Sequence, residues 1–304
     1  MAFAQGSRSQ LAFKAETTVG TPVTVDTVLP INTHSLNLTK ERVAGNEIQA
    51  DRMARVDRHG NKQAGGDIVV DLRKDTYDEF ILSALLSTDT FASNGDAATV
   101  GTTPSFFTIE DQMLDISKAR KFTSMHVSSM ALSIAPNQMV QTTFGFVGTN
   151  MVSNQTPTSV TPASSNPVPV DAYTGTISVG GSTVALITSM DLSLNNNFSP
   201  AFVIGSASAA EVNYGRATVE GSISAYVEDT ATLYDLFVDE TESSIEVQVL
   251  DLDGNGYTFT VPRAKLNGGD IPLGGEEARI VTMPFVGLYD STTGTNLKVT
   301  KVVV

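Results

Sequence analysis

The sequence predicts a mainly β protein made of two tandem copies of one sheet unit, each with a short flanking α-helix. Three observations predict this fold. Apolar and polar residues alternate with a period of two in many short segments, which is typical of strands with one buried face. Several short segments of the first half recur in the same order in the second half, as a tandem duplication would produce. A segment rich in Pro, Ser and Thr separates the two halves.

The recurring segments are mostly predicted strands. Residues 66–72 (Gly-Asp-Ile-Val-Val-Asp-Leu) resemble residues 221–227 (Gly-Ser-Ile-Ser-Ala-Tyr-Val), with an apolar residue at every second position. The other strand matches are residues 35–38 with 191–194, 107–109 with 259–261, and 146–148 with 285–287. Each match is weak by itself, because any sheet contains such patterns. Their common order predicts the duplication, and two unrelated sheet domains are the alternative.

A short helix is predicted over residues 76–86. Thr76 and Glu79 have the spacing of a capping box. An apolar stripe at helical spacing predicts that this helix packs on its sheet; its residues are Tyr77, Phe80, Ile81, Ala84 and Leu85. In the second half, residues 233–237 repeat the Tyr-Asp-x-Phe pattern at the corresponding place.

The domain boundaries follow from composition. Residues 150–172 contain four of the twelve prolines and almost no charge, so we expect an extended linker over residues 151–172. The first domain then covers residues 1–150 and the second covers residues 173–304. The first contains a long charged loop at residues 40–65, where apolar periodicity is lost.

Charge is distributed unevenly along the chain. It has 33 acidic and 19 basic residues and a formal net charge of −14, yet eight of the basic residues lie between positions 40 and 74. From residue 190 onward there are 16 acidic and 6 basic residues. A basic segment on an acidic body can attract other copies of the chain. The alternative is a solvated loop whose charges pair locally.

Composition argues against an enzyme. Without cysteine and with only three scattered histidines, the chain offers little for a thiol nucleophile or a metal cluster, and we expect no cofactor. Residues 251–256 resemble the start of a calcium-binding loop, but Pro262 stands where the final Glu ligand belongs, so a hairpin turn fits better. The acidic balance also argues against nonspecific DNA binding.

Localisation follows from hydropathy. The first residues lack the apolar run of a secretory signal, and no segment is apolar enough to cross a bilayer as a helix. We therefore expect a protein that is made in a cytoplasm and has no membrane anchor.

The span from Leu36 to Leu86 resembles the tail tube proteins of long-tailed bacteriophages, in particular the two-domain family with a duplicated tube fold. The resemblance is carried by residues 35–38, 46–52, 57–60, 65–68 and 75–80, and it covers about a sixth of the chain. It implies a β-sandwich or half-barrel whose copies assemble into rings around a DNA conduit. Edge strands that close across subunits would also be protected from aggregation.

This resemblance implies a virion tail protein that is assembled in the bacterial host cytoplasm. Its main partner would be itself. If an ancestral ring held six single-domain subunits, three duplicated chains would fill six similar positions, so the duplication predicts trimeric rings with pseudo-sixfold symmetry, and a hexamer of whole chains is the alternative. A tape-measure protein and tail completion proteins are further expected partners, and viral DNA would pass through without tight binding. The candidates for contacts between stacked rings are Lys40, Arg42, Arg52, Arg55, Arg58 and Lys62. The candidates for an acidic lumen wall are Asp67, Asp71, Glu220, Glu228 and Glu246.

A different class of function is an exported adhesin or a carbohydrate-binding β-sandwich, which the Thr- and Ser-rich linker would suit. That function requires export, and the chain shows no signal for it. It also has no Trp and only 7% aromatic residues, which leaves little stacking surface for sugars.

Overall fold

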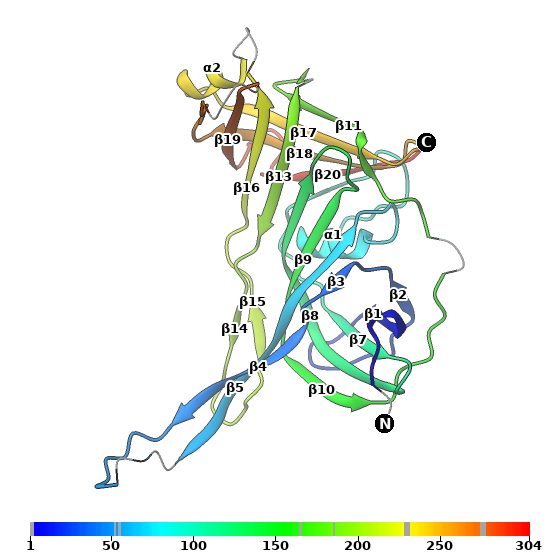
Figure 1. The fold of residues 1–304 in the computed structure, drawn as a ribbon, viewed down its shortest axis with the longest axis vertical. Helices are drawn as coiled ribbons and strands as arrows, with labels where there is room; N and C mark the ends of the chain where they lie inside the picture. Colours follow the sequence, from blue (N-terminus) through cyan, green and yellow to red (C-terminus); the bar gives the residue numbers. More distant parts are fainter. Residues whose placement is uncertain are drawn as a thin grey trace.

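The computed structural model describes residues 3–51, 53, 56–163, 166–184, 186–227, 232–273 and 278–304. Their regular structure is mainly β, as the sequence predicts (Figure 1). The helices are a 3-10 turn, η1 (Gly6–Arg8), and two short α-helices, α1 (Asp78–Ala84) and α2 (Thr232–Val238).

The first half has two layers that share one long strand, β8 (Lys118–Ile134). One layer contains β3 (Thr33–His34), β4 (Asn37–Ala44), β5 (Asp57–Asp71), β9 (Gln141–Gly148) and the C-terminal part of β8. The other contains the N-terminal part of β8, β7 (Phe107–Met113), β1 (Ser9–Ala15) and β2 (Thr27–Leu29), with β10 (Asn150–Gln155) on the free side of β8.

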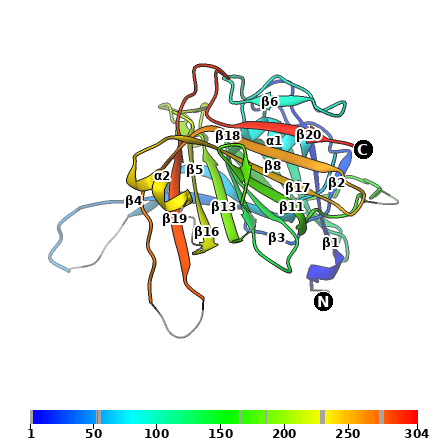
Figure 2. The same ribbon diagram turned by 90° about the horizontal axis from the view of Figure 1, so that it is seen from above.

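The second half repeats this pairing order. Its first layer contains β13 (Ile187–Asn195), β16 (Thr218–Tyr226), β19 (Ile280–Gly287) and the C-terminal end of β18 (Gly256–Leu266). Its second layer contains β18, β17 (Ser243–Leu250), β11 (Asp171–Val179) and β12 (Ser182–Thr183), with β20 (Lys298–Val302) on the other side of β18. Figure 2 shows this second layer crossing over β13 and β16.

The register of the strands also repeats. Gly66 of β5 lies opposite Phe146 of β9, and Gly221 of β16 lies opposite Phe285 of β19. These are the pairs that align when residues 66–72 are matched with 221–227 and residues 146–148 with 285–287. One predicted match is wrong: residues 107–109 lie in β7 and residues 259–261 in β18, whereas β7 corresponds to β17. An aromatic residue followed by Thr is too common in strands to fix register.

The two halves form one sheet because β8 pairs with β13. Residues 129–134 of β8 run antiparallel to residues 190–195 of β13, with Leu132 opposite Leu192. The resulting sheet runs β5–β9–β8–β13–β16–β19, with β3 and β4 at the β5 edge. We call it the shared sheet. A second link joins the layers behind it, where β6 (Ala97–Thr99) of the first half pairs with β20.

The core of the first half is centred on Phe80 of α1. Its ring lies 4.8 Å from Phe13, 5.1 Å from Phe107 and 5.2 Å from Phe146, measured between ring centroids. The predicted apolar stripe is therefore buried. The predicted capping box does not form, because no side chain caps the helix and the Thr76 hydroxyl donates to Lys74 O instead.

The predicted linker is held at both ends. Residues 150–155 form β10, so the segment without regular structure is shorter than predicted. Thr158 donates to Glu110 through its backbone N–H and its hydroxyl. Buried Val170 donates its N–H to Leu72 O and accepts a bond from Val140 N. Because strand pairing is a long-range contact, composition alone did not reveal it.

Candidate functional site

One face of the shared sheet packs on the hydrophobic core, and the other face does not contact the core. The side chains on the free face are the odd-numbered residues at 67–71, 129–133, 141–147 and 189–195, and the even-numbered residues at 218–226 and 280–286. We call this the open face. Alternation within each strand produces it, since Met190, Leu192 and Leu194 are buried while Asp191 is exposed.

The open face continues across both halves in register. Asp71, Gln141, Ser133, Asp191 and Ser222 are successive neighbours along one cross-strand row. In the adjacent row Ser193 lies opposite Glu220. The surface is hollowed over β9, β8, β13 and β16, where Ser133, Asp191 and Glu220 are among the lining residues. The face is thus a shallow polar trough that spans the junction between the halves.

Charge on the open face has one sign. Asp67, Asp71, Asp191 and Glu220 lie on it, and none of the residues that define it is Lys or Arg. Asp67 and Glu220 are exposed, and Asp71 is half-buried and accepts a hydrogen bond from Asn32 Nδ2 at 2.7 Å. A polyanion near this face would be repelled rather than bound.

Three of the five predicted lumen residues therefore share one face. Glu246 does not: it is exposed on β17, in the second layer, opposite Thr260 and Ser178. Glu228 lies outside the described residues. Asp191 was missed, although its alternation with Met190 and Leu192 indicated a wet position. Its place beside Ser133 depends on the β8–β13 pairing, which has no local signal in the sequence.

The charged loop predicted at residues 40–65 is instead a two-stranded arm, a name that we use for the described residues between 39 and 62. β4 and β5 continue beyond the body as an antiparallel hairpin, and Figure 1 shows it projecting far from the rest of the molecule. Every residue from 39 to 51 is exposed. The two strands pair here without alternating apolar residues, because hydrogen bonds between their backbones stabilise the hairpin and burial of side chains does not.

The arm holds like charges close together. Lys40 lies opposite Lys62, and Arg58 lies opposite Val43, whereas Arg42 Nε is 2.7 Å from Asp57 Oδ2. Arg52 and Arg55 lie outside the described residues. Like charges directly across an antiparallel pair are destabilising by a few tenths of a kcal/mol. The pair at Lys40 and Lys62 would therefore gain from an acidic partner.

Large apolar side chains are exposed near the tip of the arm and at a neighbouring hairpin. Ile48 and Met53 are 100% and 70% exposed on the arm. The hairpin of β14 (Ser199–Ala201) and β15 (Glu211–Asn213) exposes Val203 and Ile204 in the turn between its strands. It meets the arm where Lys62 N donates to Ala207 O. Exposed apolar groups that gather in this way are typical of surfaces that bind another protein.

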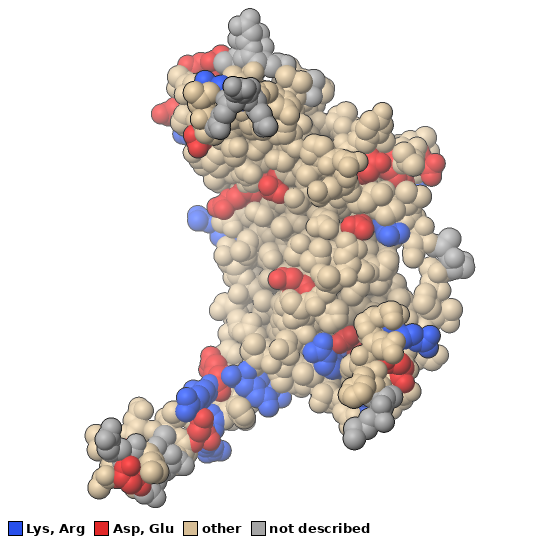
Figure 3. All heavy atoms as spheres, in the orientation of Figure 1, with Lys and Arg blue, Asp and Glu red and all other residues tan. Residues whose placement is uncertain are grey.

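The opposite end of the molecule is acidic. Asp235, Asp239, Glu240 and Glu242 lie in or just after α2. Figure 3 shows several red side chains and a few blue ones at the α2 end, and blue side chains with red ones among them where the arm leaves the body. Arg263 pairs with Glu242, and Lys265 lies 3.7 Å from Glu240, so this end has an excess of two carboxylates among these residues. Between residues 40 and 62 the sequence has six basic and four acidic residues. The two ends therefore differ in the sign of their net charge.

The comparison with known families gives one decisive match. The sequence model of a family described as phage tail tube protein matches residues 6–287. The chain belongs to the phage tail tube protein family. The search among curated proteins finds no match.

The family makes this a structural protein of the virion tail and points away from an enzyme. None of its described helices has the length and apolar character needed to span a membrane. The mainly β fold agrees with the tail tube assignment.

Two histidines of this tail tube protein have structural surroundings. His126 is buried between the rings of Phe106 and Phe198, each 5.5 Å away, and burial lowers its pKa to about 4. His34 Nε2 lies 3.5 Å from Asp111 Oδ1, and Asp111 is bound more closely by Arg120. Neither arrangement has the geometry of an activated nucleophile.

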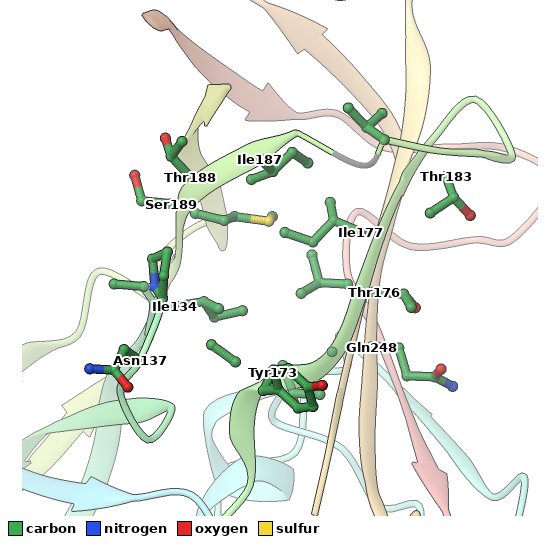
Figure 4. Close-up of a pocket in the computed structure, with 18 residues that line it drawn as sticks. Ile134, Asn137, Tyr173, Thr176, Ile177, Thr183, Ile187, Thr188, Ser189 and Gln248 are labelled. Carbon is green, nitrogen blue, oxygen red and sulfur yellow. The ribbon is translucent and has the colours of Figure 1, made fainter. Parts of the chain in front are cut away.

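A large cavity of the tail tube protein also lacks reactive groups. It measures about 600 Å³ and lies between β11, β13, β17 and the end of β8 (Figure 4). Ile134, Ile177 and Ile187 lie around it, and its described lining contains no Asp, Glu, His, Lys or Arg. The predicted hairpin turn at Asp251 is confirmed, since Asp251 Oδ1 accepts bonds from Asp253 N and Asn255 N.

Proposed function

We propose that this protein assembles into stacked rings that form the phage tail tube, and that the open face lines the conduit through which DNA is ejected. The observation that carries the proposal is the open face itself. It is continuous across the two halves, polar, and acidic without a basic residue. A wall of this kind lets DNA pass, because it offers no cations to replace the counterions of the phosphates.

We infer the ring size from the repeated pairing order of the two halves. If each half fills one of six similar positions, three chains make a ring with pseudo-sixfold symmetry. A ring of six whole chains is the alternative. Rings of either size would stack through heterologous contacts, which continue along an axis instead of closing.

The charged arm is the proposed contact between rings. It carries Lys40, Arg42, Arg58 and Lys62, and its tip exposes apolar side chains that its own chain does not cover. The acidic α2 end is the complementary surface. We expect Arg52 and Arg55 to contribute to the same contact. A tape-measure protein and tail completion proteins would bind the lumen and the ends of the tube.

Electron microscopy of the purified protein at increasing concentration tests the function. We expect rings with a central hole that stack into rods. Mass photometry of the smallest ring should give three times the 32.2 kDa mass of the chain. Six times that mass would select the hexamer, and a monomer at every concentration would contradict the proposed function.

A further inference from the structure

The internal junction between the halves indicates how one chain meets the next. In that junction, the C-terminal part of β8 pairs with β13. The repeated topology makes β18 and the residues after it the counterpart of β8, and β3 with β4 the counterpart of β13. Both counterparts are edges of the shared sheet. Among the described strands β3 and β4 pair only with β5, and the bridge given for the residues after β18 joins Asp270 to Thr282 of β19.

The register of this second junction can be read from the first. Leu192 lies opposite Gly221 of β16. Asn37 lies opposite Gly65 of β5, which places Leu36 opposite Gly66, the glycine equivalent to Gly221. Leu36 therefore corresponds to Leu192. On the other edge, Asp270 exchanges backbone bonds with Thr282 of β19. In the first half, Ala131 pairs with Thr143, the residue equivalent to Thr282. Asp270 is therefore the counterpart of Ala131. At the internal junction Leu192 lies opposite Leu132, and Ser193 lies opposite Ala131. By the same register Leu36 would lie opposite Ile271. Asn37 would lie opposite Asp270.

We propose that residues 34–39 of one chain pair antiparallel with residues 268–273 of a neighbouring copy in this register. The inference rests on the proposed tube and specifies the contact within its ring. It would make the shared sheet of one chain continuous with that of the next. Leu36 and Ile271 would meet on the core side, and Asn37 and Asp270 on the open face.

The backbone groups of the β3–β4 edge have the required directions. Ser35 N donates to Asp67 O of its own sheet, so the neighbouring N–H groups of His34 and Leu36 point outward. Leu38 N donates to Asn37 Oδ1 at 2.9 Å, a bond within its own strand. In the internal junction the corresponding residues of β13 face β8, because Asn196 N donates to Ser128 O and strand bonds alternate.

The other edge alternates in the matching sense. Asp270 bonds inward to Thr282, so Gly269 and Ile271 point their backbone groups outward. Ile271 O accepts a hydrogen bond from Arg279 Nη2 at 2.7 Å, which the N–H of the neighbouring strand would replace. Pro272, which has no N–H, corresponds to Ser133, whose N–H is directed away from β13 in the internal junction. The proline therefore removes no bond from the proposed pairing. A slip by one residue would set Leu36, on the core side of its own sheet, opposite Asp270 or Pro272, which lie on the open side.

Cysteine cross-linking tests the register, and the chain contains no native cysteine. Asn37 and Asp270 would form a non-hydrogen-bonded pair, with Cα atoms about 4.5 Å apart, which a disulfide can bridge. The Asn37→Cys and Asp270→Cys proteins are mixed and oxidised under assembly conditions. We expect a covalent dimer in the mixture that neither protein forms alone.

Two controls calibrate the result. Thr39→Cys mixed with Asp270→Cys is displaced by two residues, beyond about 7 Å, and should give roughly tenfold less dimer. Ser193→Cys with Ala131→Cys in one chain reproduces the same geometry at the internal junction and should close within the monomer. Dimer yields that do not depend on register would overturn the pairing.

Electron microscopy of the same mixtures separates the two proposals. Rings without the cross-link between positions 37 and 270 would overturn the register and leave the tube standing. Monomers with neither rings nor cross-link would overturn both. Rings with the cross-link would support both.

Discussion

Glu110 is a fully buried carboxylate with partners on both oxygens. Oε1 accepts from Thr158 Oγ1 at 2.9 Å and lies 2.8 Å from Lys121 Nζ, while Oε2 accepts from Gln112 Nε2 and Thr158 N. Burial alone would raise the pKa of Glu110, but the bonds from Lys121, Gln112 and Thr158 outweigh it and lower the pKa below the ordinary 4.5. Glu110 thereby ties the segment after β10 to β7.

Glu110→Gln should lower the free energy of unfolding at pH 7 by about 2 kcal/mol, because an amide nitrogen would face donors that need an acceptor. The lowered pKa means that the wild-type advantage is complete above pH 4.5 and is lost as the pH falls through the folded pKa. Urea unfolding from pH 7 to pH 3 measures this difference.

Glu41→Gln is the control, since Glu41 is exposed on the arm. It should change stability by less than about 0.5 kcal/mol at every pH. A Glu110→Gln deficit that stays constant down to pH 3 would show that the charge of Glu110 does not stabilise the fold.

At the scale of the strand, Gly66 and Gly221 show why the two copies repeat a glycine. A Cβ on Gly221 would lie 2.3 Å from Asp191 O and 2.4 Å from the Phe285 ring, and one on Gly66 would lie 2.6 Å from Ser35 O. Both glycines allow the first strand of a copy to approach the second closely. The repeated Gly in residues 66–72 and 221–227 is thus a packing requirement.

Gly221→Ala should therefore destabilise the protein by about 1–3 kcal/mol through overpacking between β13, β16 and β19. Gly6→Ala is the matched control, because nothing lies within 4 Å of a Cβ there. Thermal and urea unfolding of both variants measure the difference. Equal stability of the two variants would mean that the strands can separate without cost.

The arm is the element on which ring stacking is proposed to depend. Lys40→Glu with Arg58→Glu should leave urea unfolding within about 0.5 kcal/mol of the wild type, since both side chains are exposed. Rings should form but rods should shorten, because the arm would then repel the acidic α2 end. Rod lengths are measured by electron microscopy.

Lys40→Arg with Arg58→Lys keeps the charge and should restore rod length. If the charge-reversed protein forms rods as long as those of the wild type, the arm does not hold rings together through its charge.

At the scale of the whole molecule, the open face is one surface made by both halves. Asp67→Lys with Glu220→Lys should leave tubes assembled, because both side chains are exposed. The altered wall should bind a short DNA duplex, with affinity falling by an order of magnitude or more between about 50 and 200 mM salt. Cosedimentation of labelled DNA with tubes measures binding.

Glu246→Lys with Asp253→Lys makes the same charge change in the second layer, where both residues are exposed. These tubes should bind DNA no better than wild-type tubes. Comparable binding by both double variants would remove the open face from the lumen.

The sequence by itself determined the features that depend on local order. Period-two alternation identified the strands and the wet positions Asp67, Asp71 and Glu220, and the repeated segments indicated two copies with one register. The resemblance of residues 36–86 pointed to the family that the comparison with residues 6–287 then established. Alternation works because neighbouring side chains of a strand must point to opposite faces.

Only the tertiary structure decided which strands are neighbours. The β8–β13 pairing joins the halves, adds Asp191 to the open face and makes it continuous, while the position of β17 removes Glu246 from it. The charged segment became a hairpin through bonds between β4 and β5 that leave no apolar pattern. Strands pair through backbone N–H and C=O groups, which are the same in every residue except proline. The sequence therefore does not indicate which distant strands pair.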